Sequence, residues 1–132
     1  MIVKATAVLR VENVERTIEW YKTHLGFESD PFPDKPPYEF AMIFNLLATL
    51  MVRRHAGYRR SPDWKSWDLY LNLSDESVRE YHAKMKDAGL VVRDLQRMPY
   101  GMIEFDIADP DGHIICLGGL LQDAGDIPTP FE

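Results

Sequence analysis

The sequence predicts an α+β fold in which two paired βαβββ modules form an open mixed-sheet barrel around a central cleft. Two stretches of alternating polarity, residues 5–11 and 68–73, each predict a half-buried strand. They lie about 60 residues apart, which indicates an internal repeat. Each stretch is followed by an amphipathic helix that ends at a glycine, then by a short strand and a hairpin. Two copies complete the pattern, whereas a solenoid needs three or more.

The first module begins with the strand ATAVLRV, and Asn13 is predicted to cap the following helix. The helix ends at Gly26, and its apolar residues recur every three or four positions: Val14, Ile18, Tyr21 and Leu25. A short strand at residues 27–29 and the hairpin EFAMIF–ATLMVRR complete the module. The proline-rich segment 30–38 is expected to be a stiff loop at the cleft mouth.

The second module repeats this order, beginning with the strand DLYLNL. Either Ser74 or Asp75 is predicted to cap its helix, which ends at Gly89. The apolar residues of this helix are Val78, Tyr81, Met85 and Ala88. A strand at residues 90–93 and the hairpin MIEFDI–HIICLGG follow.

The length of 132 residues suits a single domain. We expect module 1 at about residues 1–55, a crossing segment at 56–65, module 2 at about 66–120 and a C-terminal tail at 121–132. Trp20, Trp64, Trp67 and the tail are available to cover exposed sheet edges, so we also expect a homodimer.

Composition excludes several classes of protein. The net charge of −6 argues against a nucleic-acid partner, and no apolar run is long enough for a membrane helix or resembles a signal peptide. The single cysteine, Cys116, argues against disulfides and a multi-cysteine zinc site, so the cytoplasm is the expected compartment.

Two motifs resemble a known family. The stretch VENVERTIEWYKTHLGF, and the turn DPDG at 109–112 followed by HIICLGG, are similar to segments of the vicinal oxygen chelate superfamily. That superfamily includes glyoxalase I, extradiol dioxygenases, and fosfomycin and bleomycin resistance proteins. The order of the motifs and the repeat between them carry the resemblance, which covers about residues 5–119.

The resemblance implies four metal-ligand positions, and these fall on Thr6, Met51, Asp68 and Cys116. Only Asp68 is an ordinary ligand for a hard divalent ion. His24 and His82 are predicted on helices, His55 in the crossing segment and His113 after the DPDG turn, so they do not complete a site. We therefore expect no metal and no other cofactor.

Strand parity predicts which side chains line the cleft. In MIEFDI, the apolar alternation places Ile103, Phe105 and Ile107 under the helix and Glu104 and Asp106 on the cleft side. The predicted ligand-binding residues are Asp68, Glu104, Tyr70, Asn72, Phe40, Met42, Phe44, Met51, Met102, Cys116 and Thr6. Two alternatives stay open: the apolar members fill a closed core, and the carboxylates face water or pair with Arg10 or Arg53.

Two function classes remain. The first is a metal-free protein that binds a small molecule, as the bleomycin-resistance branch implies, and sequesters an aromatic or cationic compound. The second is a diverged lyase, isomerase or transferase that uses Asp68 or Glu104 as a metal ligand or general base. Cys116 has no predicted activating base, which favours a buried apolar role over a nucleophile.

Overall fold

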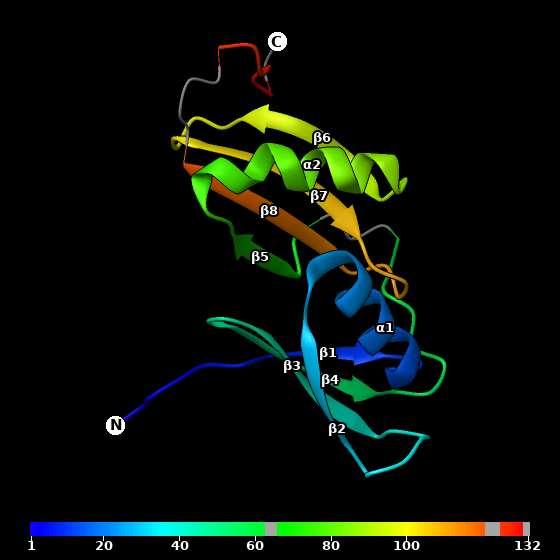
Figure 1. Cartoon of the computed structure of the whole chain (residues 1–132). Helices are drawn as coiled ribbons and strands as arrows, with labels where there is room; N and C mark the ends of the chain where they lie inside the picture. Colours follow the sequence, from blue (N-terminus) through cyan, green and yellow to red (C-terminus); the bar gives the residue numbers. More distant parts are fainter. Residues whose placement is uncertain (63–65, 121–124, 131–132) are drawn as a thin grey trace. The chain divides into compact units, whose positions relative to one another are not determined.

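The structure is a computed structural model that describes residues 1–62, 66–120 and 125–130 (Figure 1). Contacts within the chain divide it into two compact units, Met1–Arg60 and Ser61–Glu132. Each unit contains one of the two predicted repeats. The units are described separately.

The first unit is a four-stranded mixed sheet with one helix. Its elements are β1 (Ala7–Val11), α1 (Val14–Leu25), β2 (Glu28–Phe32), β3 (Phe40–Asn45) and β4 (Ala48–Arg54). The strands lie in the order β1-β4-β3-β2, with β1 parallel to β4 and the other pairs antiparallel. Because β1 and β4 run parallel, β1 cannot be joined to β4 by a hairpin, and α1 begins the connection between them.

Helix α1 begins and ends where the sequence predicts. The side chain of Asn13 accepts a hydrogen bond from the backbone N–H of Arg16, and Gly26 has a left-handed conformation with φ of 69°. Tyr21 and Leu25 are buried, as are Leu9, Ile43 and Val52 on the sheet. The helix therefore covers one face of this sheet, and the opposite face carries the half-buried methionines and phenylalanines of β3 and β4.

The second unit repeats the same order. It contains β5 (Leu69–Asn72), a short 3₁₀ helix η1 (Asp75–Ser77), α2 (Val78–Asp87), β6 (Val91–Arg97), β7 (Met102–Ala108) and β8 (Ile114–Leu120). The strand order is β5-β8-β7-β6, with β5 parallel to β8. Helix α2 lies across one face of the sheet (Figure 1), where Val78 and Met85 are buried and the ring of His82 packs against Phe105.

The predicted cap of the second helix takes a different form. Ser74 lies at the N-cap of η1, but its side chain makes no capping hydrogen bond. The carboxylate of Asp75 instead accepts the backbone N–H of Leu120 at 2.8 Å. Asp75 thus joins the start of the helical segment to the end of β8, a long-range contact that the local pattern did not reveal.

The α+β class and the two βαβββ modules are confirmed, and both sheets are open. Strands β2 and β6 extend three and four residues beyond their predicted ends, so residues 30–32 belong to a strand and not to the proline-rich loop. In β2 the extension pairs Phe32 with Phe40, whose rings stack at 5.3 Å. A cleft between the modules remains a prediction.

Part of the C-terminal tail packs on its own unit. Asp126 forms an ion pair with Arg79 at 2.9 Å, and the carbonyl of Pro128 accepts the N–H of Arg97. Ile127 is buried. Neither helix of the described chain has the length and apolar character needed to span a membrane.

The DPDG turn is held by a buried hydrogen-bond network. The Oδ1 atom of Asp109 accepts the backbone N–H groups of Asp111 and His113, and its Oδ2 lies 2.7 Å from Nδ1 of His113. Gly112 has φ of 89°, a conformation that glycine adopts without strain. Burial lowers the pKa of His113, but the hydrogen bond and charge of Asp109 outweigh it, so the pKa is raised above its usual value.

This raised pKa predicts how stability depends on pH. Protonated His113 stabilises the folded chain fully below the unfolded pKa of about 6.5, and the contribution is lost as pH rises through the folded pKa. In urea unfolding from pH 5.5 to 9, the parent should lose stability with a slope of up to about 1.4 kcal/mol per pH unit from this proton. His113→Gln should lack that component, and His55→Gln, at an exposed site, should retain it. Equal slopes in all three proteins would contradict the assignment.

Candidate functional site

The candidate site lies on the face of the second sheet that α2 does not cover. Ile103, Phe105 and Ile107 are buried on the helix side of β7, as strand parity predicted. Glu104 and Asp106 point to the opposite face, where their side chains are 0% and 9% exposed. Two neighbouring carboxylates are thus removed from water, which is costly unless they are paired.

Arg93 on β6 pairs with both carboxylates. Its Nε lies 2.7 Å from Asp106 Oδ2, and its Nη2 lies 2.8 Å from Asp106 Oδ1 and 3.0 Å from Glu104 Oε1. Its Nη1 donates to the side-chain carbonyl of Gln96 at 2.9 Å. The hydrogen bonds to Asp106 raise the pKa of Arg93, so the guanidinium remains charged.

Three aromatic side chains complete the network. The hydroxyls of Tyr70 and Tyr100 donate to Glu104 Oε2 and Oε1 at 2.9 and 2.6 Å, and the indole N–H of Trp67 donates to Asp106 at 3.1 Å. The guanidinium of Arg93 lies 5.8 Å from the Trp67 ring centroid, within cation–π distance. Every carboxylate oxygen of Glu104 and Asp106 therefore accepts at least one hydrogen bond.

Two breaks in strand register, one between Val91 and Arg93 and one between Arg93 and Gln96, bring these polar side chains to this face. Arg93 pairs with Asp106 and Gln96 pairs with Glu104, so three steps along β6 match two along β7. The extra residue is a β-bulge, which shifts the alternation of side chains. Arg93 and Gln96 consequently share a face although they are three positions apart, an offset that places side chains on opposite faces of a regular strand.

Cys116 lies beneath this network and is fully buried. Its Sγ is 3.6 Å from Nη2 of Arg93. Burial, with the charges of Glu104 and Asp106, raises the pKa of the thiol well above its usual value. The sulfur therefore stays protonated and is a poor nucleophile, in agreement with the sequence-based expectation.

Gly118 on β8 makes room for Tyr70. A Cβ atom at Gly118 would overlap the Tyr70 hydroxyl and lie 3.0 Å from Cζ of that ring and 3.2 Å from Cβ of Glu104. Tyr70 can cross this strand and reach Glu104 only because no side chain stands there. Burial and the hydrogen bond to Glu104 raise the pKa of Tyr70, so it stays a donor.

The structure brings together only some of the predicted site residues of the second unit. Tyr70, Glu104 and Cys116 lie in the network. Asp68 lies just before β5, where its Oδ2 accepts the N–H of Ile114 at 2.9 Å. Asn72 is exposed and Met102 is half-buried.

The predicted residues of the first unit lie on the face of its sheet opposite α1. These are Phe40, Met42, Phe44 and Met51, all half-buried, with Thr6 just before β1. The sequence left open a pairing of Glu104 with Arg10 or Arg53, and the structure instead pairs it with Arg93 of its own sheet. The sequence reasoning missed Arg93, Tyr100 and Gln96, and it left Asp106 outside the predicted ligand-binding set.

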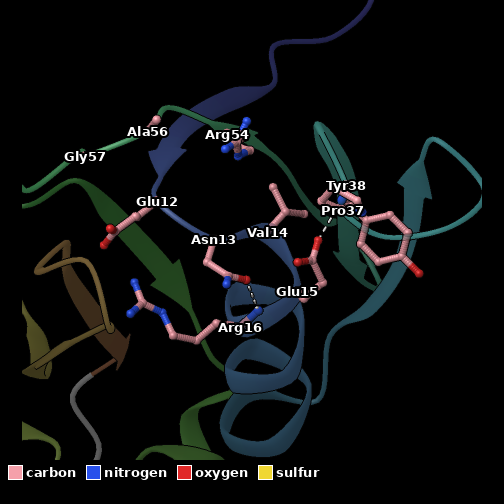
Figure 2. Close-up of a pocket in the computed structure, with 10 residues that line it drawn as sticks. All are labelled: Glu12, Asn13, Val14, Glu15, Arg16, Pro37, Tyr38, Arg54, Ala56 and Gly57. Carbon is pink, nitrogen blue, oxygen red and sulfur yellow. Dashed lines mark hydrogen bonds between the residues drawn. The ribbon is translucent and has the colours of Figure 1, made fainter.

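A separate cavity of about 430 Å³ lies in the first unit at the N-terminal end of α1 (Figure 2). It is lined by Glu12, Asn13, Val14, Glu15, Arg16, Pro37, Tyr38, Arg54, Ala56 and Gly57. The charges of its two acidic and two basic side chains cancel. Glu15 already accepts a hydrogen bond from the backbone N–H of Tyr38 at 2.7 Å. None of the predicted ligand-binding residues lines it, so the network of the second unit remains the candidate site.

The residues do not fit the metal ion that the resemblance implies. Asp68 is engaged by the backbone of Ile114, and the guanidinium of Arg93 lies beside Cys116, where its charge would repel a cation. Thr6 and Met51 supply a hydroxyl and a thioether, which are poor ligands for hard divalent ions. Among described residues, ligand atoms of Asp109, Asp111 and His113 lie within 4.8 Å of one another, but Asp109 is occupied by the DPDG turn.

Several solved structures are similar to this one over most of their length. TioX from Micromonospora sp. ML1 is 20% identical, with a TM-score of 0.67 over 89% of this chain and 100% of that one. A glyoxylase/bleomycin resistance protein/dioxygenase domain from Frankia sp. EAN1pec is 14% identical, with a TM-score of 0.72 over 93% and 95%. This chain has the glyoxalase and bleomycin-resistance fold.

The fold is shared with proteins of different activity. The fosfomycin resistance protein FosX from Listeria monocytogenes is 14% identical, with a TM-score of 0.68 over 93% of this chain and 97% of that one. No protein-family model matches the sequence, and no curated protein matches it. The fold is therefore the one that the resemblance implies, and function has to be argued from the site.

The position of Gly118 predicts a measurable coupling. Gly118→Ala should displace Tyr70 from Glu104 and destabilise the chain by about 1–3 kcal/mol in urea unfolding. Gly125→Ala is the matched control, since nothing lies near its added Cβ. Tyr70→Phe should cost less in the Gly118→Ala background than in the parent, because the clashing hydroxyl is removed. A Gly118→Ala protein as stable as the parent would contradict this arrangement.

Proposed function

We propose that the chain binds a small aromatic or cationic molecule without a metal, at the helix-free face of the second sheet. The observation that carries this proposal is the buried Glu104–Arg93–Asp106 network, bordered by Trp67 and Tyr100, which are 41% and 56% exposed. Exposed aromatic faces beside fixed polar groups are typical of small-molecule sites. The glyoxalase and bleomycin-resistance fold supports the class of protein but not its ligand.

The contacts of Glu104 favour binding over catalysis. Both of its oxygens already accept hydrogen bonds from tyrosine hydroxyls, and one also pairs with Arg93. A general base needs a free oxygen within hydrogen-bond distance of the substrate proton. Holding a ligand without chemical change requires only that one of these hydrogen bonds be replaced by a bond to the ligand, with no proton transfer.

The first test measures metal content and ligand affinity together. Protein dialysed without chelator should carry far less than one equivalent of Zn, Ni, Mn, Fe or Co by elemental analysis. Compounds selected from a library by thermal shift should then bind Glu104→Ala more weakly than the parent by about 1–3 kcal/mol, because a charged hydrogen-bond partner is lost. Asp68→Ala should have a smaller effect, since that carboxylate serves the backbone of Ile114.

Two results would overturn the binding proposal. One equivalent of tightly held metal that disappears in Asp68→Ala would make the chain a metalloprotein with an altered ligand set. Unchanged affinity in Glu104→Ala and Asp68→Ala would move the site away from the network. Asp94→Asn removes a carboxylate that pairs with α2 and provides the matched control for net charge.

We also propose that the chain forms a homodimer in the cytoplasm. Val8 and Phe32 are more than half exposed on the first sheet, and Leu46 and Leu47 are almost fully exposed at the β3–β4 turn. Such apolar surface is common at subunit contacts. Trp20 packs on Tyr21 and His24, Trp67 belongs to the network, and Trp64 lies outside the described residues.

Sedimentation velocity checks the dimer. At micromolar concentration the main species should have twice the chain mass of 15.3 kDa. The apolar contact should keep the dimer intact in high salt, because salt screens charge pairs but not apolar burial. A single 15.3 kDa species at every concentration would contradict the proposal.

A further inference from the structure

The network has an excess of negative charge. Among the residues that the structure describes, the guanidinium of Arg93 forms ion pairs with both carboxylates, those of Glu104 and Asp106. Both carboxylates are almost completely removed from water, so the remaining charge is poorly solvated. Residues 61–132 also contain 6 Lys and Arg against 14 Asp and Glu, which adds a negative field around this unit.

Arg93 has little capacity left for an anionic ligand. Three nitrogens of its guanidinium are engaged: Nε and Nη2 by the carboxylates and Nη1 by Gln96. A ligand carboxylate would have to displace one of these hydrogen bonds. It would also add negative charge to a site that already has a negative excess. The electrostatics therefore favour a ligand with a positive charge.

Tyr100 is the donor that a ligand can replace. Arg93 is bound to two carboxylates and Tyr70 is half-buried against Gly118, whereas Tyr100 is 56% exposed in the turn between β6 and β7. The next residue, Gly101, has φ of 84°, as the turn requires. The Tyr100 hydroxyl is neutral, and a charged donor on the same oxygen of Glu104 makes a stronger hydrogen bond.

The aromatic surroundings suit a cation as well. Trp67 and Tyr70 pack edge to face, with ring centroids 5.3 Å apart, and Trp67 already lies within cation–π distance of Arg93. The exposed part of Trp67 gives an apolar body a surface beside the carboxylates. A ligand with an aromatic body and one cationic group satisfies both features.

We propose that the ligand is an organic monocation whose charged group binds Glu104 in place of the Tyr100 hydroxyl. This assignment rests on the proposed function and specifies its ligand class. When no ligand is bound, the Tyr100 hydroxyl supplies the hydrogen bond to this oxygen of Glu104. It makes affinity depend on the charge of the ligand as well as on its apolar area.

The test uses three probes that share one ring and differ in charge: benzylamine, benzyl alcohol and benzoate. Binding is followed by ¹⁵N NMR of the Trp67 indole N–H, identified by its loss in Trp67→Phe. Benzylamine should bind roughly tenfold more tightly than benzyl alcohol, and benzoate should not bind. Equal or tighter binding of the alcohol or benzoate overturns the assignment of charge.

Variants separate charge from structure. Glu104→Gln should weaken the binding of benzylamine by roughly tenfold and leave the binding of benzyl alcohol unchanged. Asp94→Asn should change the affinity for neither probe. Tyr100→Phe keeps all buried charges. It should increase the affinity for benzylamine about threefold, because the hydroxyl that competes for Glu104 is absent. Weaker binding in Tyr100→Phe would show that the hydroxyl contacts the ligand, and it would overturn the replacement.

The outcomes also separate this inference from the proposed function. Library compounds that bind through the network but are neutral or anionic overturn the inference alone. No response of the Trp67 signal to any probe or library compound overturns both.

Discussion

The ion pairs of Arg93 are the interaction on which the helix-free face of the second sheet depends. Glu104 and Asp106 lie two residues apart on one strand and therefore point the same way, into an environment with little water. Without the guanidinium the two charges would repel each other and remain unsolvated, which is strongly destabilising. The two register shifts of β6 that bring Arg93 and Gln96 into place are thus part of the site.

The two units share a topology but differ in the chemistry of their helix-free faces. In the first unit this face carries methionines and phenylalanines such as Met42 and Phe44, half-buried and without buried charge. In the second unit it carries the Glu104 network. The backbone pattern requires only apolar residues under the helix, so the other face is free to diverge. A shared fold therefore says little about what each face binds.

Sequence parity predicted part of the candidate site. Alternation placed Glu104, Asp106, Tyr70 and Cys116 on one face, because side chains alternate strictly in a regular strand. It could not predict the position of Arg93. Alternation fails at a bulge, and nothing in the stretch VVRDLQR indicates where the register shifts.

Local signals determined the elements, since each depends on residues close in sequence. The Asn13 cap, the Gly26 stop and the DPDG turn are set by hydrogen bonds and backbone angles within a few residues, so they could be predicted. The partner of Glu104 and the bond from Asp75 to Leu120 join residues that the sequence separates. Only the tertiary structure decided these two contacts, because many charged groups in the sequence could pair with Glu104. Folding selects the group whose strand lies next to that of Glu104.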